Sequence, residues 1–355
     1  MRKFYLDNIR WVTVLLVMVY HIFYMFNAAG VVGGVGSFRK VQYQDGLLYF
    51  VYPWFMVLLF LIAGISARYA LEKISAGEFL RKRTWKLLVP STLGLFVYQW
   101  IVGYYNIKIG GGLEYIPDFM VYIVSAVSGI GPLWFAQVLW LCSLLLLLVR
   151  KIDGQDRLWK LGKQCNFIML FLFALFIWAG SQVLNVPVLT TYRFGIYMVA
   201  FLLGYFVFSH GQVQEMLEKI CLPMLMVSIV MGIIYTVSYF GENYADANVL
   251  QSLFTNVYAW FMVLAVLGCG GKWFDRQNKF SRYMTKAGYG FYVNHYSLAL
   301  IPCYYLKNGT ALPAWAVYIA AFLIEFAGTF ILYEIIRRIP IVRCLILGIR
   351  RNVGS

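Results

Sequence analysis

Four ionisable residues lie inside long apolar stretches of this chain: Arg10, His21, His295 and Glu325. Ionisable groups are costly in apolar segments, so each of these residues is a candidate for function. A guanidinium group binds anions, and a neutral imidazole can take a proton from a hydroxyl group. The four residue types therefore indicate acid–base chemistry next to a cationic binding site.

Arg10 and His21 are eleven residues apart. In an α-helix this spacing leaves the two side chains about 20° apart around the axis and about 16.5 Å apart along it. Both should therefore share one face, with Arg10 at the membrane surface and His21 near mid-depth. Asp7, three residues before Arg10, is placed to orient its guanidinium group. The alternatives are a snorkelling anchor for Arg10 and a hydrogen-bonded packing residue for His21.

His295 and Glu325 lie in the last two apolar stretches, at depths close to that of His21. A buried glutamate needs a partner or a proton. We hypothesise that Glu325 orients one of the two histidines, as an acid orients the base in hydrolytic triads. The alternatives are a protonated Glu325 that binds a backbone carbonyl, and a His295 that only bridges helices.

The composition shows which elements must hold these residues. Of the 355 residues, 62% are hydrophobic and only 13% are charged, and the mean hydropathy is +0.72. Soluble domains carry about 25% charged residues, so ordinary cytosolic, disordered and coiled-coil proteins are excluded. Long apolar runs favour helices over the alternating strands of a barrel. The chain is predicted to be all-α, a polytopic transmembrane helical bundle.

We predict about ten spans, and we take the first as a retained helix rather than a cleaved signal. A short interfacial or re-entrant helix is expected near 116–131, and His210, just after the sixth span, is expected to be solvated. The spans are 8–27, 47–70, 87–107, 132–150, 165–186, 190–209, 221–240, 251–271, 287–306 and 313–336.

The cations are strongly segregated between the two sides of these spans. Of the 30 lysines and arginines, all but five fall on the side of the N-terminus, and the five are Arg39, Lys40, Lys108, Arg193 and Lys307. Cytoplasmic loops carry the excess of cations, so both termini should be cytoplasmic. The net charge of +15 is thus a topology signal and does not indicate a nucleic-acid partner. Arg193 is either an interfacial anchor or a site for an anionic group.

The positions of several motifs resemble those of membrane-bound acyltransferase family 3, which includes O-acetyltransferases and succinyltransferases of bacterial envelope glycans. The spacing of Arg10 and His21 resembles the family's Arg-x10-His signature. Further segments follow in the family's order: basic residues 79–86, Gly131-Pro132-Leu133-Trp134-Phe135 and Tyr292-Val293-Asn294-His295. The end, with Tyr333-Glu334, Arg337-Arg338-Ile339-Pro340 and Gly348, looks most like the glucan-succinylating branch. One departure is Lys86, where the family often has a second arginine after Arg83.

The resemblance implies an acyltransferase that takes an acyl group from cytoplasmic acyl-CoA and delivers it to a hydroxyl of an extracytoplasmic glycan or lipid-linked acceptor. Acyl-CoA would be a co-substrate, with no metal and no permanently bound cofactor. The whole chain, 1–355, would be one integral-membrane domain with a basic cytoplasmic tail at 337–355. It would be a multi-pass protein of a bacterial inner membrane, surrounded by lipid.

Each candidate residue receives a role from the resemblance. His21, with His295 and Glu325, would be catalytic; Trp134 would line the acyl tunnel. The donor's phosphates would be bound by Arg10, Arg81, Arg83 and Lys86. Segment 81–86 can instead serve topology alone, and Trp134 can be a packing residue.

A non-enzymatic transporter or flippase is the alternative from another functional class, because such carriers also place polar groups at mid-membrane. No inverted repeat is visible in the sequence, however, and the polar groups cluster in the first and the last two spans. These observations favour the enzyme.

Overall fold

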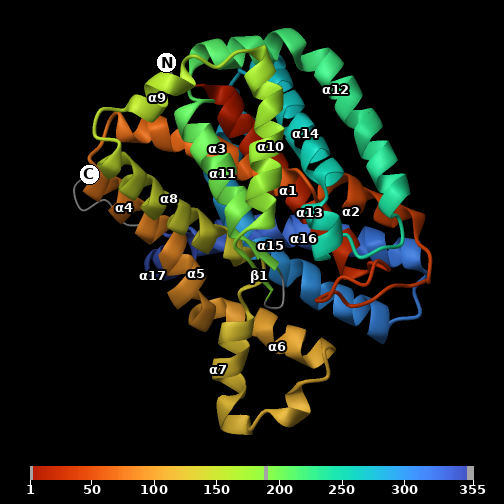
Figure 1. Ribbon diagram of the computed structural model, residues 1–355. Coiled ribbons are helices and arrows are strands. Elements are labelled where there is room, and N and C mark those ends of the chain that lie inside the picture. Colours follow the sequence, from red (N-terminus) through yellow and green to blue (C-terminus); the bar gives the residue numbers. More distant parts are fainter. Residues whose placement is uncertain (1–2, 188–190, 350–355) are drawn as a thin grey trace. The chain divides into compact units, whose positions relative to one another are not determined.

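The computed structural model describes residues 3–187 and 191–349, and its regular structure is almost entirely helical (Figure 1). An antiparallel hairpin of β1 (Asn185–Pro187) and β2 (Thr191–Arg193) is the exception. The all-α prediction is confirmed. The helices are α1 (Phe4–Met25), α2 (Gly46–Val51), α3 (Phe55–Leu71), α4 (Ala76–Arg83), α5 (Val89–Gly94), α6 (Trp100–Ile109), α7 (Asp118–Ser128), α8 (Trp134–Ile152), α9 (Arg157–Gly162), α10 (Phe167–Gln182), α11 (Phe194–Phe206), α12 (Gly211–Tyr239), α13 (Ala247–Gln251), α14 (Leu253–Trp273), α15 (Lys279–Gly309), α16 (Ala314–Ile336) and α17 (Pro340–Leu347).

Seven helical stretches among the described residues are long and apolar enough to cross a membrane. The remaining predicted spans are helical too: α10 and α11 are shorter, and α15 is long but more polar. The seven stretches are Phe4–Met25, Tyr43–Leu71, Ala76–Ile109, Gly131–Ile152, Gly211–Tyr239, Leu253–Trp273 and Ala314–Ile336.

Three helical stretches begin well before the predicted spans. The stretch that holds the third span begins at Ala76, α12 at Gly211 and α15 at Lys279, which is eleven, ten and eight residues before the predicted starts. These extensions are rich in polar residues, so hydropathy alone misses them although the helix continues. Helix α10 ends at Gln182, where the chain turns toward the β1–β2 hairpin.

The chain forms two compact units that interleave along the sequence. The first unit comprises Met1–Thr13, Gly46–Leu80 and Leu141–Thr285; the second comprises Val14–Asp45, Arg81–Trp140 and Lys286–Ser355. The boundaries between the two units fall within α1, α4, α8 and α15, and the single membrane domain of 1–355 stays a prediction.

In the first unit, α12 packs along α14 and α3 packs along α11 (Figure 1). Two glycines allow the close approach of α3 and α11. A Cβ on Gly64 would meet the backbone carbonyl of Phe201, and one on Gly204 would meet that of Leu61. Small residues at such contacts let membrane helices gain packing energy that side chains would prevent.

His210 is not solvated, contrary to the prediction. Its side chain is only 6% exposed and its ring stacks on Trp159 at a centroid distance of 4.2 Å. Its Nε2 atom lies 2.9 Å from the Trp159 carbonyl oxygen, and burial lowers the pKa of this histidine. Arg68 also packs on the Trp159 ring, with its guanidinium carbon 4.2 Å from the ring centroid, and it forms an ion pair with Asp156 at 3.2 Å. This packing fixes α9 on α3.

Arg193 is also a buried residue of the first unit, with 3% exposure. Its Nη2 atom donates a hydrogen bond of 3.0 Å to the carbonyl oxygen of Leu250. It therefore connects β2 to α13 and does not have the exposed position of an interfacial anchor.

The stretch Ala76–Ile109, which belongs to the second unit from Arg81 onward, alternates between α-helical and π-helical segments. The π-helical segments are Thr84–Leu88 and Leu95–Gln99. Each π-helical turn adds a residue and rotates the following face of the helix. Helix α7 pairs with α6 (Figure 1) and occupies the region predicted as an interfacial or re-entrant helix.

We expect both termini to be cytoplasmic, because 25 of the 30 cations fall on their side of the predicted spans. Reporter fusions after Ser355 and within the loop 30–45 should report opposite sides of the membrane. The same side for both fusions would contradict the predicted topology. Arg350 and Arg351 of the predicted basic tail lie outside the described residues.

Candidate active site

Two histidines from opposite ends of the sequence meet in the second unit. His21 of α1 and His295 of α15 have ring centroids 4.9 Å apart, and Nε2 of His295 lies 3.1 Å from Nδ1 of His21. His295 is fully buried, and His21 is half-buried. The two histidines that the sequence places at similar depths are thus direct neighbours.

The hydrogen bonds assign the protons of this pair in its neutral form. Nδ1 of His295 lies 2.7 Å from the carbonyl oxygen of Tyr292 and 3.2 Å from that of Phe291. A carbonyl oxygen only accepts, so this nitrogen carries the proton and Nε2 of His295 is an acceptor.

The same logic extends to His21. Its Nδ1 lies 2.8 Å from the carbonyl oxygen of Val17 and also faces the acceptor Nε2 of His295. Nδ1 of His21 is therefore the donor toward both. The remaining nitrogen, Nε2 of His21, carries the lone pair, as a general base requires.

Glu325 does not orient either histidine. It is fully buried on α16, and neither of its carboxyl oxygens has a hydrogen-bond partner among the described residues. The hydroxyl of Thr329, one turn further along α16, also has none. Both the predicted contact with a histidine and the alternative bond to a backbone carbonyl are therefore absent. The backbone carbonyl of Val17 supplies the orienting acceptor instead, since the helix already places it one turn before His21.

The Gly131–Phe135 segment lies directly against α15, the helix that carries His295. The hydroxyl of Tyr292 donates a hydrogen bond to the carbonyl of Pro132, and the ring of Phe135 meets that of Tyr292 at 5.6 Å. A Cβ at Gly131 would lie 3.2 Å from the ring of Tyr296, which packs edge-on against His21 at 5.1 Å. Two motifs that are far apart in sequence therefore build one wall around His21.

Trp134 is the first residue of α8 and is half-buried. Its ring lies 6.4 Å from that of Phe135, at nearly a right angle. Trp134 is therefore part of the segment that packs beside His21, and its role in lining the acyl tunnel stays a prediction.

Tyr296 is a site residue that the sequence reasoning missed. A signal was available: Tyr289, Tyr292 and Tyr296 follow at spacings of three and four, which puts them on one face of a helix. That face is the one turned toward His21 and the Gly131–Phe135 segment.

Arg10 belongs to the first unit, where its guanidinium group is held in place from two sides. Nη1 lies 3.0 Å from a carboxylate oxygen of Asp7, and Nη2 donates to the hydroxyl of Ser66 at 2.8 Å. The expectation that Asp7 orients Arg10 is confirmed. The Arg10 side chain remains 40% exposed, so an anion can still reach it.

The basic residues of the second unit differ in their surroundings. Arg81 is exposed, and Arg83 is half-buried at the end of α4. Lys86 has partners within the second unit: its ammonium group donates to the carbonyl oxygen of Leu347 at 3.1 Å and lies 4.3 Å over the Tyr289 ring. Lys86 therefore binds the end of α17, and its contact with a donor phosphate stays a prediction.

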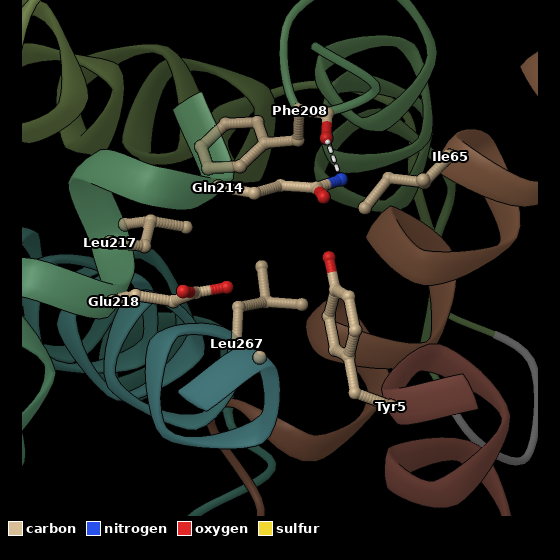
Figure 2. A pocket seen from close by; sticks show the side chains of 8 residues that line it. Tyr5, Ile65, Phe208, Gln214, Leu217, Glu218 and Leu267 are labelled. Carbon is tan, nitrogen blue, oxygen red and sulfur yellow. Dashed lines mark hydrogen bonds between the residues drawn. The ribbon is translucent and has the colours of Figure 1, made fainter. Parts of the chain in front are cut away.

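A shallow pocket without room for a water molecule lies elsewhere, in the first unit (Figure 2). The amide of Gln214 donates to the carbonyl of Phe208, and the space between Tyr5, Leu267 and Glu218 is too narrow for a donor molecule. None of the candidate catalytic or donor-binding residues lines it. The described residues also contain no cluster of three histidine, cysteine or acidic side chains that could hold a metal ion.

Comparison with protein families identifies residues 3–334 as a match to a family described as an acyltransferase domain. Comparison with curated proteins and with solved structures gives no match. The family match covers nearly the whole chain. It includes the histidine pair, the Gly131–Phe135 segment and the cations Arg10, Arg81, Arg83 and Lys86. The chain therefore belongs to the acyltransferase 3 family of membrane acyltransferases.

Proposed function

We propose that this membrane acyltransferase transfers an acyl group, acetyl or succinyl, from cytoplasmic acyl-CoA to a hydroxyl of an extracytoplasmic envelope glycan or a lipid-linked acceptor. The bacterial inner membrane is the proposed location. The observation that carries the proposal is the histidine pair, which leaves Nε2 of His21 as a base. Such a base is what the attack of an alcohol on a thioester requires.

In the proposed reaction, Nε2 of His21 takes the proton of the acceptor hydroxyl as its oxygen attacks the thioester carbonyl. The C–O bond forms, the C–S bond breaks, and the proton then passes from His21 to the departing sulfur. The products are the ester and free CoA, so protons and electrons balance. We propose direct transfer; an acyl-His21 intermediate is the less favoured route.

His295 is the positioning residue in this scheme. It holds Nδ1–H of His21 in place and stabilises the imidazolium that forms when Nε2 takes the proton. We assign Glu325 no proton transfer, since its carboxyl oxygens are hydrogen-bonded to neither histidine. Arg10, Arg81 and Arg83 are the proposed contacts for the phosphates of the donor, and Trp134 the proposed tunnel wall.

The test combines a purified-protein assay with an analysis of cells. Protein in lipid nanodiscs should release CoA from acetyl-CoA or succinyl-CoA, and faster when glycan acceptor is added. Mass spectrometry of envelope glycans should find acyl esters only in cells that contain the protein. If the glycan crosses the membrane in a protein-dependent way without being acylated, the transporter alternative is correct and this proposal is wrong.

A further inference from the structure

Four tyrosines and a lysine form a separate cluster in the second unit. We name it the outer tyrosine platform: Tyr104, Tyr105 and Lys108 of α6 with Tyr304 and Tyr305 of α15. The hydroxyls of Tyr105 and Tyr305 are hydrogen-bonded at 2.8 Å. The ring of Tyr105 meets those of Tyr104, Tyr304 and Tyr305 at centroid distances of 5.6, 5.8 and 6.0 Å.

Lys108 adds a cation to the platform. Its ammonium nitrogen lies 5.2 Å from the Tyr304 ring and 5.8 Å from the Tyr105 ring. Among the described residues it has no acidic partner. It is also one of only five cations on the side that the charge distribution assigns to the outer face. Its donors therefore remain available to a ligand.

Part of the platform lies on α15, the helix that carries His295. Tyr304 and Tyr305 follow His295 by nine and ten residues on α15, which is a rise of about 13.5–15 Å toward the predicted outer face. The same spacing turns the two tyrosines by about 180° and about 280° around the helix axis. The platform therefore lies on another face of α15 than His295, and an extended acceptor with one hydroxyl at His21 would have to pass around this helix to reach it.

The rings of the platform meet edge to face. Their planes lie at 65° to 82° to one another, so ring faces and ring edges form a corner. The hydroxyls of Tyr105 and Tyr305 meet each other, and Tyr305 is 51% exposed. The C–H faces of sugar rings pack on such aromatic faces, and sugar hydroxyls bind tyrosine hydroxyls and ammonium groups.

We propose that the outer tyrosine platform binds sugar units of a glycan acceptor, with Lys108 donating to their hydroxyl groups or to an anionic substituent. This inference rests on the proposed function, because it specifies an oligosaccharide as the acceptor. It adds a binding site at a distance from the reacting hydroxyl, so long acceptors should bind more tightly than single sugars.

The experiment measures binding without any acyl donor. Full-length protein in nanodiscs is titrated with fluorescently labelled laminarihexaose, a linear glucose oligosaccharide, and with glucose as the short control. Tyr304→Ala should weaken hexasaccharide binding about tenfold, since a stacking contact is lost, and Lys108→Ala should weaken it similarly. Tyr304→Phe keeps the ring and should remain within about threefold of wild type. Glucose binding should not change.

Tyr115→Ala is the matched control. Tyr115 is 86% exposed and lies on the α6–α7 connection outside the platform, so its loss should leave sugar binding intact. No binding of laminarihexaose to wild type, or equal loss in Tyr115→Ala, overturns the inference. Variants that alter only the stability in nanodiscs would identify a lipid-facing belt and also overturn it. Because no donor is present, an inactive enzyme would count against the proposed function and not against the platform.

Discussion

His21→Ala should lower single-turnover acyl transfer by about 10²- to 10⁴-fold, the usual loss when a general base is removed. The reason is that Nε2 of His21 is the lone-pair nitrogen of the histidine pair. Donor affinity should stay close to wild type, because the proposed phosphate contacts come from arginines. Rapid-quench measurement of acyl transfer, with acyl-CoA binding measured separately, distinguishes lost chemistry from lost binding.

His295→Ala provides the comparison, and its effect should be smaller. Nδ1–H of His21 would still donate to the carbonyl of Val17. Nε2 of His21 would therefore keep its lone pair. His295→Asn, whose side-chain oxygen can accept from Nδ1–H, should recover part of the rate. Full activity in His21→Ala together with loss only in His295→Ala would move the catalytic base to α15 and contradict the assignment.

Arg10→Ala and Arg83→Ala should each raise the dissociation constant of acyl-CoA by about 10- to 150-fold. This corresponds to about 1.5–3 kcal/mol for a charge-assisted hydrogen bond to phosphate. Calorimetric titration with CoA and with dephospho-CoA would measure the loss and show whether a variant ceases to distinguish the two.

Arg157→Ala is the control for the loss of positive charge. Arg157 is also predicted to be cytoplasmic, and its guanidinium group bonds only the side chain of Gln155 in the described residues. Its removal changes the net charge equally but should leave affinity unchanged. Unchanged affinity in both Arg10→Ala and Arg83→Ala, or an equal loss in all three variants, would rule out these arginines as the donor contacts.

The sequence predicted those features that depend on local geometry or on the bilayer. A hydrocarbon core admits only helices or closed barrels, so composition sufficed for the fold class. The contact between Asp7 and Arg10 follows from their spacing on a helix, and it is present. The face formed by Tyr289, Tyr292 and Tyr296 could have been found in the same way.

Features that depend on tertiary contacts were predicted less well. His21 and His295 are 274 positions apart, and the sequence carries no signal that their rings touch. The similar depth of His21, His295 and Glu325 left Glu325 an equal candidate for the partner of His21. Lys86 was assigned by its charge and its place in the basic segment, and neither shows that its ammonium group also binds a carbonyl at the far end of the chain. The two π-helical segments shift the helix phase, which a regular period of 3.6 residues does not anticipate.

Lys86 and His21 each have a partner that the ribosome makes much later, so these two contacts can form only late in synthesis. Leu347 follows Lys86 by 261 residues, and His295 follows His21 by 274. At roughly 5–20 residues per second, a ribosome needs about 13–55 seconds to bridge either gap. Throughout that interval the early helices stand in the bilayer with polar groups that lack their final partners. The candidate active site should therefore be assembled among the last events of biogenesis, and a nascent chain stalled before α15 has every membrane helix up to α14 but no histidine pair.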